Sequence, residues 1–136
     1  MKRNRTIGSV LLLGVMAMSP LVAHHSAWDI YDEGQTMTIV GTVELVVDRM
    51  PHPSVELVVK GQGVHERTWA VEFDAAHRLT ESAGEPPLLL PGDLVTVCGN
   101  PGRDPGAHRL RMLALQRRDG LSLRSPVSLA ETQCVG

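Results

Sequence analysis

Residues 36–48 form a long run dominated by threonine, valine and isoleucine, interrupted once by Gly41. Such β-branched side chains favour an extended strand over a helix. A glycine inside a strand is typical of a bulge or a sharp bend. We therefore predict a long first strand that bends at Gly41 and can serve two sheets of a small barrel.

Turn residues divide the rest of the chain into shorter strands. The proline-rich segment 49–53 cannot continue a hydrogen-bonded ladder, because proline lacks the amide hydrogen. Glycine-rich and proline-rich segments mark the later turns. The expected strands after the first one cover residues 54–60, 66–73, 94–99 and 108–116, with a short last strand at 121–123.

One short helix is expected between the third and fourth strands. Asp74 is a suitable N-cap, residues 75–83 fit a helix, and Gly84 would end it. The resulting order, β-β-β-α-β-β with a long first strand, is that of the five-stranded oligonucleotide/oligosaccharide-binding (OB) Greek-key barrel. We expect a mainly β, OB-like barrel, and a small α+β sandwich is the alternative.

The first 23 residues have the pattern of a secretory signal peptide. Lys2, Arg3 and Arg5 precede an apolar stretch at residues 7–18, and the small residue Ala23 ends the segment. The stretch is shorter than the roughly 20 residues that span a bilayer as a helix. We expect a periplasmic or secreted protein with no membrane insertion after cleavage, and an uncleaved anchor as the alternative.

The expected mature chain is acidic. Three of the 13 basic side chains precede residue 24 and all 15 acidic ones follow it, so the mature chain has 10 basic side chains and a formal charge of −5. A negative surface opposes phosphate backbones, which excludes nucleic acid as the expected partner. Residues 24–136 fit one domain, with a polar tail from about residue 124 that we expect to be weakly ordered.

Two cysteines, Cys98 and Cys134, remain after the signal. An even number of cysteines in an oxidising compartment favours a disulfide. Closing this loop would stabilise the domain by roughly 3–4 kcal/mol through chain entropy. The alternative is a buried thiol at Cys98 and a loose thiol at Cys134.

Cleavage after Ala23 would leave His24 as the first residue, with a free α-amine and an imidazole on one residue. These two nitrogens can chelate a metal ion, and a third nitrogen would favour Cu(II). His52, between two prolines, is the preferred third ligand, and His25, His108 and His65 are further candidates. The alternative is that these histidines are structural. Trp28 and Tyr31 are expected to hold the N-terminal arm on the barrel.

A second candidate site lies on the barrel face. Trp69 and Arg67 alternate onto one side of the third expected strand, where they could stack on a ring and bind an anion. The alternative is that Trp69 belongs to the core. The sequence contains no serine or cysteine nucleophile motif and no phosphate-binding glycine loop, so we expect no catalytic residues.

Several short stretches resemble one family in the same order. They are His24-His25-Ser26, Tyr31-Asp32, residues 40–43, Pro51-His52, residues 69–72, and residues 90–93 with 95–97. The family is a group of small exported bacterial proteins known only as a domain of unknown function. The resemblance implies export and a β-barrel-like domain, and it supplies no catalytic residues. Residues 49–53 keep the family's Pro-His but lack its neighbouring tryptophan, asparagine and valine.

Taken together, these patterns predict an exported binding or accessory protein that holds copper through its mature N-terminal histidine. The alternative is a metal-free module that binds a protein or a small molecule on the barrel face.

Overall fold

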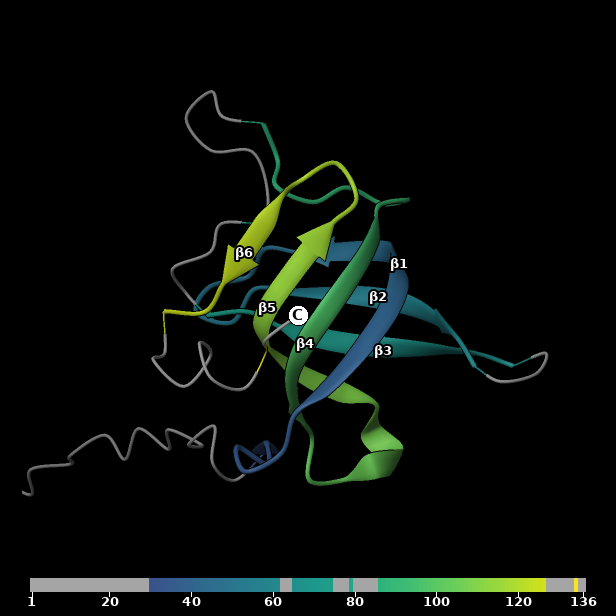
Figure 1. Ribbon diagram of the computed structural model, residues 1–136, viewed down its shortest axis with the longest axis vertical. Helices are drawn as coiled ribbons and strands as arrows, with labels where there is room; N and C mark the ends of the chain where they lie inside the picture. Colours follow the sequence, from purple (N-terminus) through teal and green to yellow (C-terminus); the bar gives the residue numbers. More distant parts are fainter. Residues whose placement is uncertain (1–29, 62–64, 75–78, 80–85, 127–133, 135–136) are drawn as a thin grey trace, which may run out of the picture.

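The computed structural model describes residues 30–61, 65–74, 79, 86–126 and 134. Its strands are β1 (Met37–Val47), β2 (Ser54–Lys60), β3 (Glu66–Glu72), β4 (Leu94–Pro101), β5 (Arg109–Arg117) and β6 (Ser122–Arg124), with a 3-10 turn η1 at Pro105–Ala107 (Figure 1). Within these ranges, no helix has both the length and the apolar character needed to cross a bilayer.

The strands close into a small barrel. The sheet order is β3-β2-β1-β4-β5-β6, and a parallel pairing of β3 with β5 joins the two ends of the five-stranded part. This order confirms the predicted mainly β, OB-like barrel. β6 is an additional strand on the outer side of β5 (Figure 1). The predicted signal peptide, residues 1–23, and most of the predicted helix, residues 75–78 and 80–83, lie outside the described residues.

Strand β1 pairs with two neighbours, as its length suggested. Residues 37–42 pair with β4 and residues 42–47 pair with β2. The bulge lies between Val43 and Leu45 and not at Gly41, where the sequence suggested a bulge or a sharp bend. A Cβ atom at Gly41 would lie 3.0 Å from the carbonyl oxygen of Val58. Gly41 is therefore needed for the close approach of β1 and β2.

The fourth and fifth strands have shifted boundaries. β4 extends to Pro101, beyond the predicted end at residue 99, because Asn100 and Pro101 continue the pairing with β5 after a register shift at Gly99. His108 was expected inside the fifth strand but precedes β5. It has a left-handed backbone, with φ of 45°, and ends the η1 turn that Asp104 caps at its start.

The core fills the barrel interior with aliphatic side chains from every strand of the closed part, together with one phenylalanine. The largest fully buried side chains include Leu57, Val71, Phe73, Leu110, Met112 and Leu115. The predicted disulfide between Cys98 and Cys134 is confirmed, with a Cα–Cα distance of 5.9 Å. It attaches the tail to β4 beside a small second cluster that includes Leu113 and Ala114.

Candidate functional site

The arm that precedes β1 is bonded to the loop between β4 and β5. Tyr31 forms an antiparallel bridge with Gly102. The Asp32 amide donates to the Pro101 carbonyl at 2.9 Å, and the Arg103 amide donates to the Ile30 carbonyl at 2.9 Å. Figure 1 shows the arm beside the loop that carries η1. The prediction that Tyr31 holds this segment on the barrel is thus confirmed, whereas Trp28 lies outside the described residues.

The side chain of Tyr31 begins a short chain of hydrogen bonds that reaches the surface. Tyr31 is 1% exposed, and its hydroxyl donates to Glu72 Oε2 at 2.7 Å. The other oxygen of the same carboxylate, Oε1, pairs with His52 Nδ1 at 2.8 Å. Burial, and then the hydrogen bond to Glu72, raise the pKa of the Tyr31 phenol. Glu72 therefore links the arm to the loop between β1 and β2 through the Tyr31–Glu72–His52 relay.

His52 is the exposed end of this relay. Its side chain is 70% exposed, compared with 23% for Glu72. Because Nδ1 faces the carboxylate, the ring presents Nε2 to a further partner. His24 and His25 lie outside the described residues. Among the residues that the structure describes, no three His, Cys, Asp or Glu side chains group closely enough to hold a metal ion.

A second set of contacts, centred on Arg111 of β5, holds the same arm. Arg111 on β5 donates to Glu33 at 2.9 Å and to Asp74 at 3.3 Å. The Ser125 hydroxyl bonds the other oxygen of Asp74. The Arg111 and Glu33 side chains are only 19% and 12% exposed, so water weakens this pair less than an ordinary surface pair. The segment that contains Tyr31 is consequently held both by the bridge to Gly102 and by the ion pair of Glu33 with Arg111.

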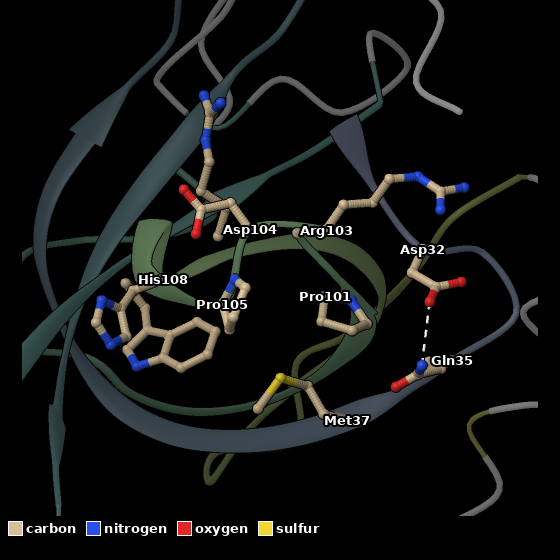
Figure 2. A pocket seen from close by; sticks show the side chains of 11 residues that line it. Asp32, Gln35, Met37, Pro101, Arg103, Asp104, Pro105 and His108 are labelled. Carbon is tan, nitrogen blue, oxygen red and sulfur yellow. Dashed lines mark hydrogen bonds between the residues drawn. The ribbon is translucent and has the colours of Figure 1, made fainter. Parts of the chain in front are cut away.

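A pocket of about 330 Å³ opens at one end of the barrel, and we call it the mouth pocket. It lies where β1 begins, where β4 ends and just before β3 meets β5. Figure 2 shows Met37, Pro101 and Pro105 around the hollow, with His108 at one side. The full lining comprises Asp32, Gln35, Met37, Trp69, Pro101, Gly102, Arg103, Asp104, Pro105, His108 and Arg109.

Two of the predicted site residues, Trp69 and His108, line this pocket, and a third, Arg67, bonds to His108. The Trp69 and His108 rings pack edge to face with centroids 5.2 Å apart. Arg67 Nη1 lies 3.0 Å from His108 Nε2. Since a guanidinium can only donate, the Nε2 lone pair of His108 accepts this hydrogen bond. Trp69 is half-buried. It packs against the core and also lines the pocket, so the structure is compatible both with a core role and with a ligand-binding role for Trp69.

The structure also separates residues that the sequence grouped. His108 belongs to the mouth pocket, whereas His52 pairs with Glu72, outside the lining. Sequence reasoning did not select Glu72 or Arg109 as site residues. Glu72 lies in residues 69–72, one of the stretches that carry the family resemblance, and this membership was the only sequence feature that could have pointed to Glu72 as a site residue. Arg109 begins a strand and carries no motif, so only the fold reveals its position.

A sequence model of a family of unknown function, DUF6152, matches residues 12–111, more than half of the 136-residue chain. The chain belongs to DUF6152. The range shared with DUF6152 contains the whole Tyr31–Glu72–His52 relay and the mouth-pocket residues Trp69 and His108. No curated protein matches the chain.

Proposed function

We propose that this DUF6152 protein is an exported, periplasmic binding protein that holds copper at its mature N-terminus. The ligands would be the amine and imidazole of His24 together with the imidazole of His52. One observation carries the proposal: His52 is exposed, yet its ring is held through Nδ1 by Glu72, which Tyr31 holds in turn.

The relay has the chemistry expected around a metal-binding histidine. Such histidines usually donate their second ring N–H to a carboxylate, which fixes the tautomer and makes the ligand nitrogen more basic. Here Glu72 accepts from His52 through one oxygen and from Tyr31 through the other. The carboxylate is therefore itself oriented, and the direction of Nε2 is set before any metal binds.

The chain can bring His24 to this position. The two outer members of the relay bind one carboxylate at 2.7 and 2.8 Å, so His52 lies close to the Tyr31 side chain. His24 precedes Tyr31 by seven residues. A fully extended segment of that length spans at most about 25 Å. His24 is therefore within reach of His52 without any change in the barrel.

The ligand set favours copper. An α-amine has a pKa of about 7.7–8.0 and is deprotonated readily by a metal near neutral pH. The amine and imidazole of His24 would close one chelate ring, and His52 would add a third nitrogen. An all-nitrogen set of this kind favours Cu(II) among the divalent first-row metals.

The test uses protein that begins at His24, after N-terminal sequencing of the exported protein has located the cleavage site. Calorimetric titration with Cu(II) should give about one equivalent, and the electron paramagnetic resonance spectrum should report nitrogen ligands. Adding one alanine before His24, or making His52→Ala, should each weaken binding at least about tenfold. His65→Ala is the matched control, because His65 is also exposed but lies outside the relay. Unchanged affinity in the alanine-extended protein would refute the chelate.

A further inference from the structure

The mouth pocket, considered independently of copper, has the features of a small-molecule site. We propose that it binds a small, flat ring compound that carries a carboxylate group. The ring would lie against Trp69, and Arg109 and His108 would receive the anionic group. This inference rests on three observations: the size of the pocket, its apolar walls, and the hydrogen bonding of its charged side chains. The acidic side chains are hydrogen-bonded within the loops, whereas Arg109 pairs with no carboxylate of the described residues.

The size and the apolar walls suit a ring. An apolar cavity of about 150 Å³ is enough for benzene, and the mouth pocket has about 330 Å³. Its apolar surface comes from Met37, Trp69, Pro101 and Pro105, which belong to three strands and the η1 turn. Mouths of β-barrels with apolar walls and a few polar groups are common ligand sites.

The acidic side chains of the lining are already used within the loops. Asp32 accepts from the Gly34 amide at 3.1 Å and from the Gln35 side chain at 3.1 Å. Asp104 accepts from the Gly106 amide at 2.9 Å and caps the η1 turn. These hydrogen bonds stabilise the local backbone and occupy carboxylate oxygens of both side chains.

The basic side chains are engaged differently. Within the described part of the chain, no carboxylate pairs with Arg109, which lines the pocket and is exposed. Arg67, which lies outside the lining, uses Nη1 to bond His108 Nε2 and so leaves His108 Nδ1–H as a donor. A planar carboxylate matches the forked donors of arginine. The available groups therefore favour an anion.

The backbone at His108 supports a binding role. Its φ of 45° is uncommon for a residue with a side chain, and such conformations cluster at ligand sites when the surroundings hold them. In this conformation the His108 ring packs edge to face on Trp69, and His108 Nε2 accepts a hydrogen bond from Arg67. One ring contact and one hydrogen bond thus hold the His108 side chain at the rim of the pocket.

The test compares two probes of the same shape, 2-naphthoate and the uncharged 2-naphthamide, by proton–nitrogen correlation spectra of the isotope-labelled exported protein. The chain has two tryptophans, so Trp28→Phe identifies the indole N–H signal of Trp69. 2-Naphthoate should shift that signal and the amides of Gly102 and Gly106. It should bind at least about tenfold more tightly than 2-naphthamide, as expected for a hydrogen bond to a charged group.

Arg109→Gln should weaken the binding of 2-naphthoate several-fold, with part of the preference retained through His108, and should leave the affinity for 2-naphthamide unchanged. Arg118→Gln is the matched control, since Arg118 follows the other end of β5 and lies outside the mouth pocket. The inference is overturned if 2-naphthoate leaves the Trp69 signal unmoved, if both probes bind equally, or if Arg118→Gln has the effect expected of Arg109→Gln.

Discussion

The Tyr31 hydroxyl provides a direct test of the relay, because Tyr31→Phe removes one oxygen and keeps the ring. The hydroxyl is buried and donates to a carboxylate at 2.7 Å. A hydrogen bond to a charged group contributes about 1.5–3 kcal/mol. Since Glu72 is 23% exposed and water can reach it, we expect the lower end, about 1.5 kcal/mol. This loss corresponds to a decrease in Tm of about 6 °C for a domain of slightly more than 100 residues.

The effect should depend on pH with a defined sign. Burial and the Glu72 hydrogen bond raise the pKa of Tyr31 in the folded protein. In the unfolded chain a tyrosine ionises near pH 10. The unfolded state therefore loses its proton first, and the contribution of Tyr31 is full below about pH 10 and decreases as the pH rises further. The stability difference between wild type and Tyr31→Phe should narrow in the same range.

The assay combines urea unfolding at a series of pH values with the ultraviolet absorbance of tyrosinate. Tyr31 is the single tyrosine of the chain, so this absorbance reports on one residue. We expect no tyrosinate signal from the folded protein at pH values where a free tyrosine ionises, and a signal that appears together with unfolding. Glu72→Gln is the control: it keeps an acceptor for the hydroxyl but removes the charge, so Tyr31 should ionise at lower pH. Ionisation of Tyr31 near pH 10 in folded wild-type protein would refute the reasoning.

Three other predictions follow from single contacts. Replacing Cys98 and Cys134 by serine should lower the free energy of unfolding by about 3–4 kcal/mol, and reductant should then have no further effect in urea titrations. Gly99→Ala should cost about 3 kcal/mol or more, because its Cβ would lie 2.1 Å from the Arg111 carbonyl oxygen, whereas Gly34→Ala should be nearly neutral in thermal unfolding. His52→Ala should change stability by less than about 1 kcal/mol, since the His52 side chain is 70% exposed, so lost copper binding in that variant would not reflect unfolding.

Much of the barrel could be predicted from local patterns. The β-branched run at 36–48 and the prolines at 51 and 53 delimit β1 and β2 to within a residue, because strand propensity and the missing proline amide act locally. The order of elements was enough to infer the Greek-key closure. The position of the bulge was not predictable from Gly41, because a glycine permits either a bulge or a close approach, and the neighbouring strand decides which one occurs.

In the candidate sites, too, local patterns select some residues but not the partners that these residues contact. Trp69 and Arg67 could be selected because the strand period places them on one side, and His52 because prolines flank it. Their partners could not be selected. Glu72 meets Tyr31 across 41 residues, and Arg67 meets His108 across another 41. No local pattern predicts such contacts, which depend on how the barrel closes and on the left-handed turn at His108.

The sequence alone therefore determined the strands, the turns, the family resemblance and the histidines that could bind a metal, because each depends on neighbouring residues. The tertiary structure decided which side chains work together. It placed His52 on the Glu72 carboxylate held by Tyr31, and it placed His108 with Trp69 at the barrel mouth. The physical reason is that hydrogen bonds and packing act over a few ångströms in space, whereas these residues are distant in the chain.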